Sequence, residues 1–244
     1  MMNIRLTLQF DGTDYHGWQI QPGKPTIQGA LRDALRIITR EDINPIGCGR
    51  TDAGVHAEEY TASFRTDSSI PVDRIPFALN ANLPQGIVCR GAEAADDDFS
   101  ANKSAAAKCY RYTIDNGMFP DVFLSRYAWH VKYELDTERM RRAAEAFLGT
   151  HDFIGFASSG FSVKTTVRTI YGIEIAKSNN IITADVTGNG FLYNMVRIIA
   201  GTLVYAGSGR IDPAEMPEII ESRRRERAGI TAPAKGLCLR KVFY

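Results

Sequence analysis

One aspartate stands between an arginine and a histidine in a stretch rich in small residues, GCGRTDAGVHA at 47–57. A carboxylate in this setting can act as a nucleophile or a base, and Gly49 and Gly54 would let a ligand approach the backbone closely. The alternative is a loop aspartate that only makes a turn among glycines. The motif alone leaves both readings of Asp52 open.

Neither a metal nor a nucleotide cofactor is expected at this motif. Asp52 and His56 have the spacing of one helical face, but Gly54 lies between them and no third ligand is near. The GK[ST] ending of a phosphate loop is absent, and GNGFLY at 188–193 does not have the pattern of a dinucleotide site. We therefore expect no metal and no cofactor.

Arg197 interrupts an apolar run, FLYNMVRIIAGTLVYA at 191–206, which predicts a helix that begins near Phe191 and is buried on most sides. An arginine in such a helix needs a partner, because burying an unpaired charge is costly. It could form a structural ion pair or extend its charge to the helix edge. It could also pair with Asp52, which would lower the pKa of that carboxylate by roughly one to three units.

Two aromatic and basic segments fit RNA contact as well as ordinary structure. Tyr110 and Tyr112 share one face of a predicted strand, so they are either core residues or a platform on which a base can stack. The run SRRRER at 222–227 is either a solvated face or a group that reaches phosphates.

The pattern of apolar residues predicts two consecutive α+β halves, residues 1–103 and 104–244, joined through the linker-like stretch at 96–106. In the first half, strands are predicted at 3–10, 60–64 and 86–94, and helices at 27–38 and 72–83. In the second half, strands are predicted at 108–114, 166–177, 181–186 and 237–244. Its helices are predicted around Met140–Leu148, from Phe191, and from Pro213 to about Arg223.

The composition is that of an ordinary globular chain. Of 244 residues, 29 are basic and 28 acidic, so a net charge of +1 indicates no global attraction to nucleic acid. The four cysteines contain no CxxC pair, and the N-terminal segment has no long apolar stretch. A cytoplasmic protein with reduced thiols is expected.

Six segments resemble the tRNA pseudouridine synthase A family, in the family's order and nearly from end to end. They are FDGTDYHGWQIQP at 10–22, GRTDAGVHA at 49–57, KCYRYTI at 108–114, GTHDFIGFAS at 149–158, GNGFLYNMVRIIAG at 188–201 and APAKGLCLRKVFY at 232–244. The stretch FSANKSA at 99–105 departs from the family, in which a His and an Arg are expected roughly where Ser100 and Asn102 stand.

This resemblance implies an isomerase that converts uridines of the tRNA anticodon stem-loop, at nucleotides 38, 39 and 40, to pseudouridine without a cofactor. It implies two tandem RNA-recognition-like (ferredoxin-like) subdomains with antiparallel sheets and a cleft between them, and a homodimer.

By match to the motifs, the resemblance also implies the roles of single residues. Asp52 is the nucleophile, Tyr110 stacks on the target base, and Arg197 pairs with the aspartate. Arg50 helps to flip or hold the nucleotide, and Leu237 forms an apolar wall. The reaction assigns no role to His56, for which we expect a structural hydrogen bond that shapes the loop. The rival readings are a non-catalytic RNA-binding module and a uridine isomerase with another RNA target.

Overall fold

The computed structural model describes residues 1–160 and 163–244, and the chain forms two compact units. Unit 1 comprises Met1–Ala106 and Cys238–Tyr244, and unit 2 comprises Ala107–Leu237. The sequence predicted a division after residue 103 and placed the last seven residues in the second half. These residues instead group with unit 1, where Cys238 and Leu239 pair with His56 and Ala57.

The sheet of unit 1 has the strand order β4-β1-β3-β10, and the short strand β2 also pairs with β3. Its pairs are antiparallel except for the parallel pair of β10 with β3. The strands are β1 (Met2–Phe10), β2 (Ile46–Gly47), β3 (His56–Thr66), β4 (Ile87–Ala94) and β10 (Leu237–Phe243).

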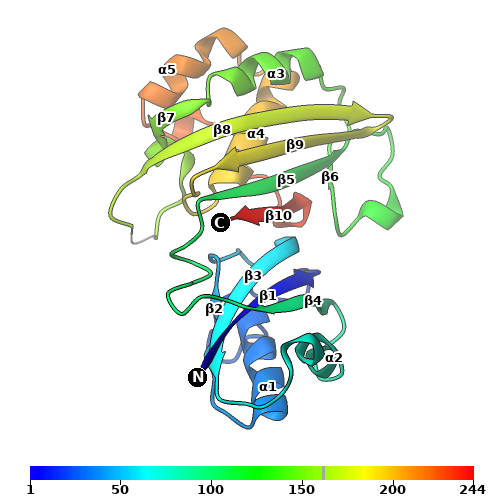
Figure 1. The fold of residues 1–244 in the computed structure, drawn as a ribbon. Coiled ribbons are helices and arrows are strands. Elements are labelled where there is room, and N and C mark those ends of the chain that lie inside the picture. The colour runs from blue at the N-terminus through cyan, green and yellow to red at the C-terminus, as the bar shows by residue number, and fades with distance from the viewer. Residues whose placement is uncertain (161–162) are drawn as a thin grey trace. The chain divides into compact units, whose positions relative to one another are not determined.

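Helices cover one face of this sheet (Figure 1). Alternate residues of β1, namely Ile4, Leu6, Leu8 and Phe10, are buried, as the alternating sequence predicts. Helix α1 (Ile27–Thr39) buries Ile27, Leu31, Ala34 and Leu35, and the side chain of Thr26 accepts a hydrogen bond from the amide of Gly29 at its start. The helix predicted at 72–83 is a 3₁₀ turn (Val72–Arg74) followed by α2 (Ile75–Asn80).

The sheet of unit 2 has the strand order β5-β9-β8-β7, with antiparallel pairs, and β6 lies parallel to β5. The strands predicted at 166–177 and 181–186 form an antiparallel hairpin, and Asn179 in its turn has a positive φ of 51°. The strands are β5 (Ala107–Asp115), β6 (Trp129–His130), β7 (Gly149–Asp152), β8 (Val167–Ser178) and β9 (Ile181–Gly188).

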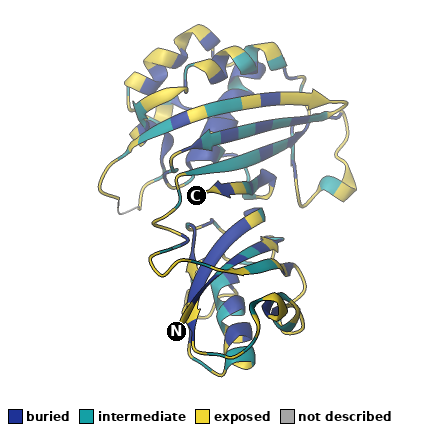
Figure 2. Ribbon diagram, viewed as in Figure 1, coloured by how far each residue is buried: buried dark blue, intermediate teal, exposed yellow. Residues whose placement is uncertain are grey.

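The core helix of unit 2 is α4, in which every residue except Arg197 and Tyr205 is buried (Figure 2). This confirms the predicted buried helix.

In the described residues no helix is both long and apolar enough to cross a membrane. The α-helices of the unit are α3 (Thr137–Glu145), α4 (Met195–Gly207) and α5 (Met216–Glu221). Its 3₁₀ helices are Val122–Leu124, Phe153–Phe156, Pro213–Glu215, Arg225–Arg227 and Ala234–Gly236.

Two predicted helix boundaries are wrong. Helix α4 begins at Met195 rather than near Phe191, because Asn194 adopts a left-handed conformation with φ 61° and the chain turns before it. Helix α3 ends at Glu145, so Leu148, expected on its buried face, is exposed. The chain turns instead at Gly149, which has a positive φ of 93°, and enters β7.

Candidate active site

Asp52 begins a tight turn between β2 and β3. Its carbonyl accepts a hydrogen bond from the amide of Val55 at 3.2 Å, and Gly54, the third residue of the turn, has a φ of 79°. That conformation favours glycine at this position. Asp52 is half-buried and Arg50 is exposed. The turn therefore holds the carboxylate near the surface on a defined stretch of backbone.

Three hydrogen bonds hold the residues that precede Asp52. The phenol of Tyr60 donates to the carbonyl of Gly49 at 2.5 Å, and the amide of Cys48 donates to the carbonyl of Thr61 at 2.9 Å. The side chain of Asn102 donates to the carbonyl of Cys48 at 3.1 Å. Asn102, in the stretch that departs from the family pattern, thus supports the motif.

An aromatic stack lies beneath this segment. The rings of Trp18 and Tyr60 stack with centroids 4.4 Å apart, and the ring of Phe10 lies 5.4 Å from that of Tyr60. A Cβ on Gly47 would lie 2.0 Å from the Tyr60 hydroxyl oxygen, so only glycine fits above the stack. These contacts bind the start of the motif to the core of unit 1.

The segment at 11–18 packs directly against the motif, backbone against backbone. The amide of Trp18 donates to the carbonyl of Thr51, and the amide of Gly54 donates to the carbonyl of Tyr15. A Cβ on Gly12 would lie 2.0 Å from the carbonyl oxygen of Val55. One on Gly17 would lie 2.2 Å from that of Thr51. Such approaches require glycine, so two segments distant in sequence form one rigid support.

His56 joins these two segments, as expected of a structural residue. Its Nδ1 lies 3.0 Å from the buried amide of Gly12 and 3.1 Å from Oδ1 of Asp11. That carboxylate oxygen already accepts two hydrogen bonds from Thr13. Because a buried backbone N–H needs an acceptor, we assign Nδ1 as the acceptor and place the ring proton on Nε2.

In the described residues no cluster of three or more side chains could hold a metal ion.

The two tyrosines of β5 have different surroundings in unit 2. Tyr112 is fully buried and donates to the carbonyl of Pro233 at 2.8 Å, and burial raises the pKa of its phenol. Tyr110 is only half-buried, and its ring meets that of Phe191 edge to face at 5.3 Å. The structure therefore makes Tyr112 a core residue and leaves part of Tyr110 accessible.

Arg197 lies in the first turn of α4 and has neighbours that orient it. Its Nε donates to the carbonyl of Ala232 at 2.7 Å, and its Nη1 donates to Oδ1 of Asn194 at 2.7 Å. The backbone amide of Ala232 in turn donates a hydrogen bond to the carbonyl of Arg197. Leu237, the expected apolar wall, is buried at the start of β10. Asp52 belongs to unit 1, whereas Tyr110, Arg197 and Leu237 belong to unit 2.

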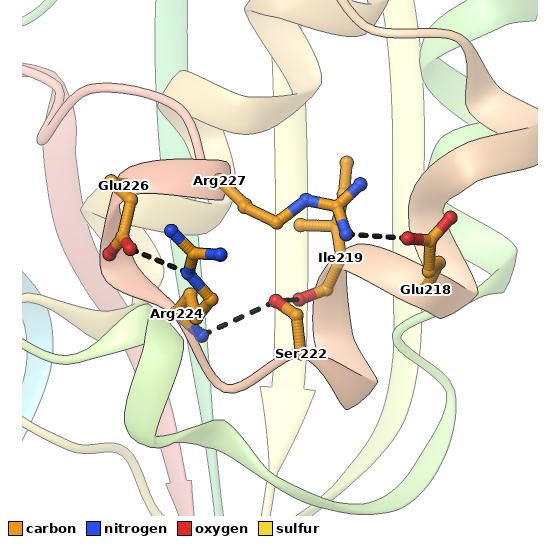
Figure 3. A network of polar contacts seen from close by, with 6 residues as sticks. All are labelled: Glu218, Ile219, Ser222, Arg224, Glu226 and Arg227. Atoms are coloured by element: carbon orange, nitrogen blue, oxygen red, sulfur yellow. Dashed lines mark hydrogen bonds and ion pairs between the residues drawn. The ribbon is translucent and has the colours of Figure 1, made fainter.

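The basic run at 222–227 is bound up in local contacts (Figure 3). Arg224 pairs with Glu226 and Arg227 with Glu218, each at 2.6 Å. Arg225 donates to the carbonyl of Gly229 and to the hydroxyl of Thr231. The pairs lie at the surface, but they offset much of the run's positive charge.

Comparison with known proteins places the chain in a family. A family model described as tRNA pseudouridine synthase matches residues 7–102 and 143–244. The chain belongs to the tRNA pseudouridine synthase family. It is 49% identical to tRNA pseudouridine synthase A of Acetivibrio thermocellus and 48% identical to that of Brevibacillus brevis. Each alignment covers 100% of both chains. A chain of a solved Cbf5-Nop10-Gar1 complex is 11% identical, with a TM-score of 0.41, over 96% of this chain and 57% of that one.

Membership of the tRNA pseudouridine synthase family establishes the activity in outline. The protein is an isomerase that converts uridine to pseudouridine in tRNA, and it therefore binds RNA. The carboxylate motif, the supporting segment at 11–18 and the helix with Arg197 all lie within the matched residues.

Sequence reasoning missed the residues that support the site. Asn194 and Ala232 hold Arg197, and Trp18 and Tyr60 lie beneath the carboxylate motif. An asparagine before a buried helix was the one local signal, since asparagine tolerates the left-handed conformation. The other partners are far apart in the chain.

The close approach of Gly12 to Val55 predicts that Gly12→Ala both destabilises the protein and slows catalysis. Its Cβ would displace the Val55 carbonyl and thereby the turn that carries Asp52. We expect a loss of about 1–3 kcal/mol in the free energy of unfolding, and a lower kcat. Gly91→Ala in β4 is the control, since its Cβ meets nothing within 4 Å. Denaturant unfolding and pseudouridine assays that show both variants alike would refute the role of the contact.

Proposed function

We propose that the protein forms pseudouridine in the anticodon stem-loop of tRNA, with Asp52 as the nucleophilic carboxylate. The observation that carries this proposal is the rigid presentation of Asp52. The carboxylate stands on a glycine-dependent turn that is backed by the segment at 11–18. A carboxylate next to an RNA polyanion disfavours binding alone, so its careful support favours a chemical role.

The reaction needs no atom beyond those of the substrate. The N1–C1′ bond breaks, the uracil turns, and a new bond joins C5 to C1′, while the proton at C5 is exchanged for one at N1. Asp52 can attack C1′ of the ribose or C6 of the base, or remove a ribose proton, and each route needs its ionised form close to the nucleotide. No redox cofactor or energy source enters this balance.

The target base has to leave its stack before it can react. Unstacking costs a few kcal/mol, and stacking on an aromatic ring returns about 1–3 kcal/mol. We assign this ring to Tyr110, whose half-buried side chain is braced by Phe191. We assign to Arg50, exposed two residues before Asp52, the task of flipping or holding the nucleotide.

Arg197 is proposed as the ionic partner of Asp52, and Leu237 as an apolar wall of the pocket. The bonds to Asn194 and Ala232 support this role, because they fix the direction of the guanidinium before the substrate arrives. A fixed cation needs no reorganisation during the reaction, and it favours the charged form of a carboxylate beside it.

The two units are proposed to be RNA-recognition-like, that is, ferredoxin-like, subdomains with a cleft between them. Unit 1 supports this assignment. Its elements follow the order β1, α1, β2, β3, α2, β4, and its strands β4, β1, β3 and β2 pair in antiparallel fashion. The four cysteines are thiols and not disulfides, which fits the cytoplasm, where we expect the enzyme to act.

We also propose that the protein is a homodimer. Four apolar residues between β5 and β6 are between 73% and 87% exposed, namely Met118, Phe119, Val122 and Phe123. A second copy that covers this segment would remove its apolar surface from water.

Asp52→Asn is expected to abolish pseudouridine formation while tRNA binding stays within a few fold. The amide keeps the size of the side chain but is neither a nucleophile nor a base. The measurement is pseudouridine mapping in tRNA from cells that lack the protein and then regain either form. Asp73→Asn, at an exposed position of the same unit, is the control. Modification by the Asp52 variant would reject the nucleophile, and loss outside the anticodon arm would correct the substrate site.

Arg197→Met is expected to lower kcat by about a hundredfold, because Asp52 loses a fixed partner. Arg197→Lys should recover part of the loss, since it keeps the charge. Arg139→Met is the matched control, because Arg139 also donates to backbone carbonyls, those of Ala206 and Ile211. Single-turnover rates and melting temperatures are the measurements. A normal rate for Arg197→Met, or an equal rate loss in the control, would refute the pairing.

Phe123→Asp is expected to convert the dimer to monomers, because it places a charge in the proposed interface. Sedimentation equilibrium measures the mass of each form. Phe77→Asp is the control, since Phe77 is a comparably exposed (71%) phenylalanine on α2 of unit 1. A monomeric wild-type protein, or a dimer that survives the Phe123 change, would contradict this interface.

A further inference from the structure

Arg168, near the start of β8, uses only part of its hydrogen-bonding capacity. Its Nη1 donates to the carbonyl of Thr165 at 2.9 Å and to that of Val167 at 2.6 Å. Among residues 1–160 and 163–244, Nε and Nη2 have no hydrogen-bond acceptor and no carboxylate pairs with this guanidinium. The side chain is half-buried, and burial lowers the pKa of Arg168 below its ordinary value.

Other arginines of unit 2 do have carboxylate partners. Arg111 forms a bidentate pair with Asp185 through Nε and Nη2, at 2.6 and 2.5 Å. Arg224 and Arg227 are paired with glutamates. A guanidinium that has no carboxylate partner among the described residues keeps its charge available for another anion. The open Nε–Nη2 edge of Arg168 is the same edge that Arg111 uses to hold a carboxylate.

This edge lies close to the aromatic pair that includes Tyr110. A Cβ on Gly190 would lie 3.7 Å from Nε of Arg168, so this end of the edge lies beside a residue without a side chain. The next residue is Phe191, whose ring braces Tyr110. The sheet register agrees, because Gly188 pairs both with Lys108, two residues before Tyr110, and with Ile170, two residues after Arg168.

We propose that Arg168 binds a phosphate of the tRNA backbone beside the nucleotide that stacks on Tyr110. The paired donors Nε and Nη2 match two oxygens of a phosphate, and Gly190 places no side chain beside Nε. Nη1, bound to the two carbonyls, holds the guanidinium in place. The position of the phosphate rests on the role proposed for Tyr110, whereas the anion site rests on Arg168 itself.

The test measures tRNA binding against salt concentration for Arg168→Met, Arg168→Lys and Arg224→Met, all in the Asp52→Asn background. Arg168→Met should weaken binding about tenfold and reduce the salt slope by about 0.7–0.9, the contribution of one phosphate contact. Arg168→Lys should keep the slope but regain only part of the affinity, since it lacks the bidentate edge. Arg224→Met, which removes an exposed and paired arginine, should change neither quantity.

An unchanged affinity and salt slope in Arg168→Met would overturn the proposal. So would a slope in Arg168→Lys that is as low as in Arg168→Met, because the cation would then have only a folding role. If Arg168→Met melts at a lower temperature, the Lys variant decides. These measurements need no turnover. A wild-type protein that modifies another part of tRNA would refute the proposed function, while the Arg168 contact would still be judged by its own slope.

Discussion

The candidate site depends on a contact between two stretches of backbone that only glycine allows. Gly12 and Gly17 bring the segment at 11–18 against the carbonyls of Val55 and Thr51. At the same contact, His56 accepts a hydrogen bond from the amide of Gly12. Asp52 lies on a turn rather than on a helix or strand, so the position of its carboxylate must be fixed by such contacts. The backbone contacts at these glycines fix the turn, as a helix or strand would otherwise do. The stacking of Trp18 on Tyr60 connects the two segments to the core.

The arginines of unit 2 differ in the groups that hold them. Some arginines, such as Arg111 and Arg227, are neutralised by carboxylates and stabilise local structure. Arg168 is instead held by two backbone carbonyl oxygens, which orient a guanidinium without cancelling its charge. A near-zero net charge is thus compatible with RNA binding, because what matters is where the unneutralised cations lie.

Most helices and strands could be predicted because their signal is local. The alternation in β1 and the helical spacing in α1 follow from which neighbours must face the core. The start of α4 could not be predicted, since the apolar run continues through residues 191–194 while the left-handed Asn194 interrupts the helix. The grouping of Cys238–Tyr244 with unit 1 had no local signal either, because it rests on pairing with β3.

The sequence by itself determined the family, the carboxylate motif and the chemical types of the candidate residues, since these depend on residue identity and spacing alone. Only the tertiary structure decided that Tyr112 is core while Tyr110 stays partly accessible, and that His56 braces the segment at 11–18. It also decided that the Nε–Nη2 edge of Arg168, beside Gly190, has no acceptor among residues 1–160 and 163–244. The physical reason is that the partners of a side chain depend on how segments far apart in the chain pack together. Neither periodicity nor composition predicts such contacts.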